Sequence, residues 1–331
     1  MKAEVKGIGL DIGTSRIVAV KRVKEQDETS AQLNAFVTLP HSKLTEGVFA
    51  REGVAHVVEG GELVVYGNEA ARFANLFNRE MRRPMTRGVL NASEPAGAAM
   101  IRRLIADVLG AAPGQGARIC FSIPGAPADS PDDLTYHEKT LRQMLAGLGY
   151  EVSSINEGLA VVLAELESTN YTGIGVSFGG GMCNVCMAYL SIPVFSFSVS
   201  KAGDFIDASA ASVAGESVTR IRAIKENSFH FNGYFGDQAK QALAVYYDEV
   251  IRLVAAELKK AAASARQAGA IGQPIPMVVG GGSSLPAGFL ERFSSCLKEA
   301  NCGIEFSEIR AAADPLNTTA KGALVAALAG I

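Results

Sequence analysis

The chain has 331 residues, of which 48% are hydrophobic and 20% charged, and its formal net charge is −3. This composition is typical of a globular protein with room for two domains, and it excludes a disordered chain. No basic cluster stands out, so the sequence does not favour nucleic-acid binding.

The first half of the chain predicts strands that alternate with helices, which indicates an α/β lobe. In chain order we expect a hairpin over residues 5–23, a polar excursion over 24–35, short strands and turns over 36–68, a helix over 70–83, a helix over 94–109, a strand over 118–124, a helix over 136–148, a strand over 151–155 and a helix over 158–167.

The second half begins with another hairpin and continues in the same alternating way. We expect the hairpin over residues 172–190, a strand over 192–199, helices over 204–213 and 218–225, a long amphipathic helix over 238–268, a strand over 277–279, a helix over 287–300, a strand over 304–306 and a final helix from about 317.

The two hairpins turn through similar glycine-rich sequences. GIGLDIGTS at residues 7–15 matches GIGVSFGGG at residues 173–181. In each segment an apolar strand runs into a glycine-rich turn. A strand–turn–strand unit used twice predicts two similar lobes, each of which offers a phosphate-binding hairpin to a shared cleft. The copies differ at one important position, where Asp11 of the first is matched by Ser177 of the second.

A third glycine loop, at residues 280–282, follows another apolar strand. Glycine lets the backbone approach a ligand closely, so that successive N–H groups point at phosphate oxygens. We expect Asp11 to hold a divalent cation through water, Thr14 and Ser15 to reach phosphate, and residues 179–181 to supply an opposing set of amides. Any one loop is equally explained as a tight structural turn, but three in this order favour a ligand site.

These motifs resemble those of the actin-like ATPases. Residues 11–15, 178–181 and 279–283 are similar to the phosphate-1, phosphate-2 and adenosine motifs of that superfamily, and the resemblance covers most of the chain. Finer similarity to the bacterial MreB and MamK branch lies in Arg83–Val89, Lys201–Asp207 and Ala223–Glu226. The resemblance implies an α/β actin-like fold, with two duplicated ribonuclease-H-like lobes around an interlobe nucleotide cleft and small subdomain insertions.

The resemblance also implies a division of the chain into lobes. The first lobe would cover residues 1–170, with a small subdomain insertion at about 30–68. The second would cover residues 171–331, with a small subdomain at about 214–237 that is reduced relative to MreB. We expect the last helix, about residues 317–330, to pack back on the first lobe.

Individual roles follow from the matching positions. Glu157 is the candidate catalytic residue, since a carboxylate there would orient the attacking water, although a solvated glutamate at a helix start explains it as well. Asp204 and Asp207 match signature acids, but their spacing also suits a helix N-cap. Arg222 and Lys225 would reach the ribose or base, or would lie on a solvated helix face.

Asp11 is also the candidate metal residue. The candidate nucleotide-binding residues are Asp11, Gly13, Thr14, Ser15, Ser177, Gly179, Gly180, Gly181, Asp204, Arg222, Lys225, Gly280, Gly281, Gly282 and Ser283.

The resemblance implies a cytoplasmic bacterial actin-like ATPase that binds ATP or ADP with Mg²⁺. It would assemble head to tail with itself into cytoskeletal filaments, with a membrane-associated or cargo protein as a further partner. Ser177 replaces the phosphate-2 aspartate, and a hydroxyl holds a divalent ion more weakly than a carboxylate, so hydrolysis is expected to be slow or absent.

Two other functions stay open. One is a non-polymerising, PilM-like or degenerate actin-fold scaffold that binds nucleotide and a protein partner. The other is a small-molecule kinase of the same superfamily, with Asp129, Asp132 or Asp133 near the substrate.

The cysteines and the apolar segments do not favour a disulfide-bonded, a secreted or a membrane-spanning protein. The five cysteines mostly lie in apolar runs, which favours reduced thiols in a cytoplasm. Cys183 and Cys186 have the C-x-x-C form, but residues three apart on a strand point to opposite faces, so we expect a structural role. We expect no secretory signal and no transmembrane segment, because no apolar run reaches the ~18–20 residues of a membrane span. Residues 322–331 are expected to be a packed terminal helix rather than a membrane anchor.

Overall fold

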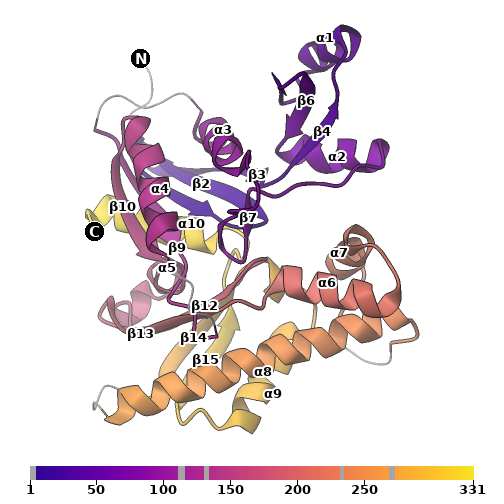
Figure 1. Ribbon diagram of the computed structural model, residues 1–331. Coiled ribbons are helices and arrows are strands. Elements are labelled where there is room, and N and C mark those ends of the chain that lie inside the picture. Colours follow the sequence, from indigo (N-terminus) through magenta and orange to yellow (C-terminus); the bar gives the residue numbers. More distant parts are fainter. Residues whose placement is uncertain (1–4, 111–115, 130–133, 232–234, 268–272) are drawn as a thin grey trace.

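Two five-stranded sheets with the same strand order form the centre of the molecule (Figure 1). The computed structural model describes residues 5–110, 116–129, 134–231, 235–267 and 273–331. The first sheet has the order β10-β9-β1-β2-β3 and contains β1 (Val5–Ile12), β2 (Arg16–Val23), β3 (Gln26–Leu33), β9 (Arg118–Ile123) and β10 (Glu151–Asn156). The second has the order β13-β12-β11-β14-β15 and contains β11 (Gly173–Phe178), β12 (Cys183–Tyr189), β13 (Ile192–Val199), β14 (Ile275–Gly280) and β15 (Phe306–Ala311).

The two sheets also share strand directions. In the first, β1 runs antiparallel to β2 and parallel to β9; in the second, β11 runs antiparallel to β12 and parallel to β14. Each glycine-rich hairpin of the sequence therefore occupies the same place in its sheet. The repeat in the sequence is a repeat of the whole five-stranded unit.

Helices cover the sheets on both sides. The first sheet packs one face against α3 (Gly97–Leu109) and α4 (Thr135–Gly147). The second packs its outer face against α6 (Gly203–Ala214), α8 (Gln238–Gln267) and α9 (Phe289–Ala300), and α7 (Val218–Asn227) packs on α6 and α8. The remaining long helices, α5 (Glu157–Glu165) and α10 (Thr318–Ala329), lie against the other faces and against each other.

α10, near the end of the chain, packs on the first sheet so closely that the two backbones touch. A Cβ at Gly9 of β1 would lie 2.0 Å from the carbonyl oxygen of Ala320, and one at Gly322 would lie 1.7 Å from that of Ala160 in α5. Both glycines are needed because the backbones approach more closely than any side chain allows. α10 therefore joins the first sheet to α5, which itself packs on β11 and β12.

A smaller unit projects from the first sheet and has its own core (Figure 1). It contains a three-stranded sheet in the order β4-β6-β5, and its elements are β4 (Phe36–Pro40), α1 (Lys43–Glu52), β5 (His56–Glu59), β6 (Glu62–Tyr66) and α2 (Asn68–Leu76). A two-stranded ribbon, β7 (Met85–Thr86) and β8 (Val89–Leu90), follows it.

The sequence predicted only strands and turns over residues 36–68, and α1 is a correction to this. Ser42 begins that helix, since its hydroxyl accepts a hydrogen bond from the backbone N–H of Thr45 at 3.0 Å. The helix ends at Gly53, whose φ of +69° suits the left-handed C-cap. The polar excursion expected over 24–35 is likewise a strand, β3, which pairs along the whole length of β2.

A loop of the first lobe joins the edge strand of the second. The backbone N–H of Ser198 in β13 donates to the carbonyl of Ala126 at 2.9 Å, and that of Ala128 donates to Ser198 at 2.8 Å. Asp129 then accepts hydrogen bonds from the backbone and the hydroxyl of Ser200. Asp129 is thus used in a contact between the lobes, while Asp132 and Asp133 lie outside the described residues.

Candidate functional site

A cavity of about 670 Å³ opens between the two lobes, and the three glycine turns of the sequence meet around it. Every candidate catalytic, metal or nucleotide-binding residue named from the sequence lines this cavity except Gly280, which ends β14 and pairs in register with Ser177. Asp129, the described candidate of the kinase alternative, does not line it. Such a concave site with convergent polar groups is where small ligands bind most often.

The first two turns have the same internal geometry and lie against each other. The backbone N–H of Gly13 donates to the carbonyl of Arg16 at 2.9 Å, and that of Gly179 donates to Met182 at 3.0 Å. A Cβ at Gly180 would lie 2.3 Å from the Ser15 hydroxyl oxygen. A side chain at Gly180 would therefore displace the Ser15 hydroxyl from its position between the two turns.

Thr14 is held between three segments. Its hydroxyl oxygen accepts a hydrogen bond from the backbone N–H of Gly88 at 2.9 Å, and it would lie 2.1 Å from a Cβ at Gly181. Thr14 therefore links the first turn to the second turn and to the segment that follows β7. Backbone amides and hydroxyls gathered in this way suit an anion.

The third turn closes the other end of the cavity. Gly281 has a φ of +89°, and a Cβ there would lie 2.4 Å from the carbonyl oxygen of Phe178. The Ser283 hydroxyl donates to the Gly179 carbonyl at 2.8 Å, which ties the third turn to the second. The loop continues into one 3₁₀ turn at Gly282–Ser284, and α9, which the sequence predicted from residue 287, begins at Phe289.

Two carboxyl groups face each other at the base of the cavity. Asp11 is the next-to-last residue of β1 and accepts a hydrogen bond from the Ser122 hydroxyl at 2.7 Å. Glu157 begins α5, where Asn184 donates to its Oε2 at 2.8 Å and Ser177 also hydrogen-bonds to it. Burial raises the pKa of both carboxyl groups, and the charge of Asp11 raises the pKa of Glu157 further. The pair therefore favours either protonation of one carboxyl group or a cation bound nearby.

Asn184 is a site residue that the sequence reasoning missed. It is fully buried, and it pairs directly across β11 and β12 with Ser177. Its side-chain oxygen accepts the backbone N–H of Gly125 at 2.8 Å while its nitrogen donates to Glu157. The hairpin register around the glycine turn identifies the position, because the residue opposite Ser177 must share its face of the sheet.

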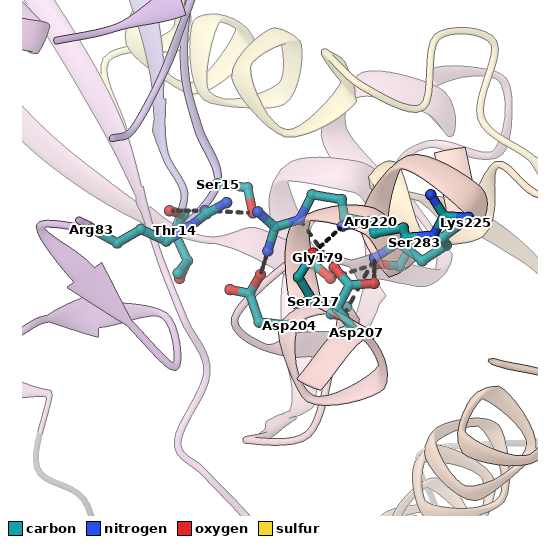
Figure 2. A network of polar contacts seen from close by, with 12 residues as sticks. Thr14, Ser15, Arg83, Gly179, Asp204, Asp207, Ser217, Arg220, Lys225 and Ser283 are labelled. Carbon is teal, nitrogen blue, oxygen red and sulfur yellow. Dashed lines mark hydrogen bonds and ion pairs between the residues drawn. The ribbon is translucent and has the colours of Figure 1, made fainter. Parts of the chain in front are cut away.

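Acidic residues of α6 pair with basic residues of α7 along one wall of the cavity (Figure 2). Arg222 donates from Nη2 to Asp204 at 2.9 Å and from Nε to Asp207 at 3.0 Å. Lys225 lies 2.8 Å from the other carboxylate oxygen of Asp207, which is fully buried. The N-cap of α6 is Ala202, so neither acid caps that helix, and Arg222 and Lys225 lie in this network rather than on a solvated helix face.

Arg83 also lines the cavity, and no site role was predicted for it from the sequence. Its Nη1 donates to the Thr14 carbonyl at 3.0 Å and to the Ser15 hydroxyl at 3.1 Å (Figure 2). Burial lowers the pKa of its guanidinium. The signal available in the sequence was its place directly before Pro84, at the start of the segment similar to MreB.

The cysteines take no part in a metal centre in the described part of the chain. All five are buried and free, and the described residues contain no group of three or more histidine, cysteine, aspartate or glutamate side chains that would hold a metal. Cys183 packs in the core of the second lobe, and Cys186 lies against Gly158 of α5. None of the helices in this part of the chain is long and apolar enough to cross a membrane.

The two lobes have the same topology, α5 and α10 join them, and a cavity with three glycine turns separates them. This arrangement defines an actin-like fold. The chain belongs to the volactin family, whose model matches residues 7–327. A comparison with curated protein sequences gives no match.

Solved structures show the same fold at low sequence identity. A MamK double helical filament is 18% identical, with a TM-score of 0.71 over 96% of this chain and 97% of that one. MreB 5 of Spiroplasma citri bound to AMPPNP is 14% identical, with a TM-score of 0.69 over 98% and 96%. The ethanolamine utilization protein EutJ from Carboxydothermus hydrogenoformans is 17% identical, with a TM-score of 0.56 over 96% and 89%.

Proposed function

We propose that this protein binds ATP with Mg²⁺ in the interlobe cavity and assembles head to tail into filaments under the control of the bound nucleotide. The observation that carries the proposal is the convergence of three glycine turns, from three distant parts of the sequence, on one cavity of about 670 Å³. Similar folds solved as a filament, and bound to AMPPNP or ADP, support it. The lobe boundary near residue 170 belongs to the same proposal.

The phosphates would lie between the first two turns. There Thr14, Ser15, Gly180 and Gly181 line one cavity, while the amides of Gly13 and Gly179 donate within their own turns and hold the turns in shape. The nucleoside would lie toward the third turn, between residues 281–283 and the side chains of Arg222 and Lys225. Backbone N–H groups bind phosphate oxygens directly, so this part of the site does not depend on charged side chains.

The donors around Asp11 fit Mg²⁺. They are oxygen atoms, and Asp11 is the residue we expect to hold the ion through water. Mg²⁺ keeps several waters and takes phosphate oxygens as ligands, so a site with few protein carboxylates suits it. When bound, the ion would neutralise charge on the phosphates.

Glu157 is the residue proposed to orient the attacking water. Its raised pKa suits a base that works near neutral pH, and Asn184 and Ser177 fix its carboxyl group. Ser177 contributes no charge where the actin-like signature has aspartate. We therefore propose that hydrolysis is slow.

Self-association is supported by an apolar turn at the surface. Tyr189, Leu190 and Ile192 surround the β12–β13 turn, and Ile192 is 69% exposed. Leu76 and Phe77, at the end of α2, are also exposed, and α2 and β13 lie on opposite sides of the molecule (Figure 1). Two different apolar surfaces at opposite sides suit a heterologous contact, which repeats as a filament when it does not close.

Titration calorimetry and sedimentation test the proposal together. We expect binding of ATP and ADP in the presence of Mg²⁺, and a sedimentable polymer, visible by electron microscopy, with ATP. Absence of nucleotide binding by the folded protein would overturn the whole proposal. Binding without polymer at any salt or nucleotide condition would overturn the filament half.

A second candidate function is a nucleotide-binding scaffold that does not polymerise. Two observations favour it, namely Ser177 in the cavity and the small extent of the second lobe's insertion, where α7 is the one helix between α6 and α8 in the described residues. This candidate predicts nucleotide binding with neither phosphate release nor polymer. The same two measurements therefore separate the candidates.

A further inference from the structure

Of two neighbouring arginines, Arg82 forms an ion pair and Arg83 does not. Arg82 forms a two-pronged ion pair with Glu94, with its Nε 2.8 Å from Oε2, and its guanidinium lies 4.6 Å from the ring centre of Phe36. Arg83, the next residue, forms no ion pair in the described part of the chain. Its hydrogen bonds there go to the Thr14 carbonyl and the Ser15 hydroxyl, both from Nη1.

None of the acids across the cavity forms an ion pair with Arg83 in the described part of the chain. Asp204, Asp207 and Glu226 contribute to the field at Arg83, but Arg222 and Lys225 pair with the first two at 2.8–3.0 Å. A partly buried cation without a counter-ion is unfavourable, because it has lost water and gained no opposite charge. The guanidinium of Arg83 therefore favours the binding of an anion in the cavity.

The position of Arg83 selects the anion. Its guanidinium is held on the first glycine turn, where Ser15 lies against Gly180 of the second turn. Its Nη2 and Nε have no acceptor among the described residues, and the side chain lines the cavity. The free edge of a guanidinium matches two phosphate oxygens in one plane, which a lysine does not reproduce.

We propose that Arg83 binds the phosphate chain of the nucleotide and supplies a cationic contact in addition to the amides of the glycine turns. This inference rests on the proposed nucleotide site and adds a residue to it. Because Arg83 belongs to the first lobe and the second glycine turn to the second, the bound phosphate chain would be held from both lobes at once.

Titration calorimetry of wild type and Arg83→Gln with ATP, ADP and adenosine, each with Mg²⁺, tests the assignment. Loss of one charge-assisted contact weakens binding about ten- to hundredfold. We expect that loss for ATP and ADP and no change for adenosine, which has no phosphate. Inorganic pyrophosphate should raise the melting temperature of wild type more than that of Arg83→Gln at the same concentration.

Arg79→Gln is the matched control, since Arg79 is exposed in the same region and the substitution removes the same charge. Its affinities should equal those of wild type. If Arg83→Gln does not fold, Arg83→Lys keeps the charge without the planar fork, and we expect it to lie between wild type and full loss. Wild type that binds ATP and ADP, with an Arg83 variant that binds them equally well, overturns this inference alone. Wild type that binds neither nucleotide overturns the proposed function instead.

Discussion

Asp11 and Glu157 place two buried carboxyl groups in one cavity, and their raised pKa values make stability depend on pH. A carboxyl group whose pKa is higher in the folded than in the unfolded state binds more protons when folded. Its stabilising contribution is complete below the ordinary value of 4.5 for Glu157 and is lost as pH rises from there into the neutral range.

Glu157→Gln should therefore stabilise the nucleotide-free protein, and more so at higher pH. The difference in unfolding free energy should grow by at most about 1.4 kcal/mol per pH unit for the one proton involved. Urea unfolding at several values between about pH 5 and pH 8 measures it. Glu167→Gln, at an exposed glutamate, is the control and should track wild type. Parallel curves for Glu157→Gln and wild type would show that Glu157 is ionised in the folded protein as it is in the unfolded chain.

Ser177→Asp restores the charge that the actin-like signature carries. Without a divalent cation, a third carboxylate beside Asp11 and Glu157 should destabilise the protein by about 1–3 kcal/mol. Mg²⁺ should recover more stability in the variant than in wild type, and phosphate release from ATP should rise. Ser177→Ala, which removes the hydrogen bond to Glu157 and adds no charge, should show neither gain. Brisk hydrolysis by wild type with no gain in Ser177→Asp would contradict the role given to Ser177.

At the scale of elements, the glycine hairpins were predictable because a short, continuous stretch of sequence determines each of them. A strand, a glycine turn and a second strand form from local sequence, and their repetition implied the duplicated sheets. β3 was not predicted because its sequence, QDETSAQL, is polar and has no strand-like apolar pattern. It is a strand because it pairs with β2 at the edge of the sheet. α1 was missed because Gly47 and short apolar runs obscure its helical spacing.

The same reasoning explains what was missed in the site. The amides of the turns follow from local sequence, whereas the roles of Arg83 and Asn184 depend on which segments fold against them. Asn184 takes its role from Glu157 on α5, and Arg83 takes its role from Thr14 in the turn between β1 and β2. Partners so distant in the chain leave no periodic pattern to detect.

The contact of α10 with α5 gives a prediction at this scale. Gly322→Ala places a methyl group where the Ala160 carbonyl lies, so α10 must shift, at a cost of about 3 kcal/mol or more. Gly47→Ala is the matched control, because Gly47 lies inside α1 with open space at its Cβ, and it should stabilise by about 0.5–1 kcal/mol. Thermal and urea unfolding of both variants measure the contrast. Equal effects would mean that α10 is not held against α5 in solution.

For the whole molecule, the lobes are joined through α5 and α10 and through the loop at residues 125–129, which pairs with β13. The first and second glycine turns also lie against each other. Asn184 connects that loop to Glu157, through hydrogen bonds to both. We therefore expect closure of the lobes around a ligand to be a hinge motion about these contacts.

A heterologous filament makes a prediction that a symmetric dimer does not. Each subunit of such a filament uses two different surfaces, so a variant damaged at one surface still adds to a filament end through the other and then blocks growth. Ile192→Asp places a charge in the apolar β12–β13 turn, where Ile192 is 69% exposed and its substitution leaves the core intact. A small fraction of this variant mixed with wild type should reduce the sedimented polymer far more than in proportion, while nucleotide binding is unchanged. Val245→Asp, at an exposed apolar residue of α8, is the control and should dilute the polymer at most in proportion. Unimpaired polymer formation by Ile192→Asp alone would remove the β12–β13 turn from the interface.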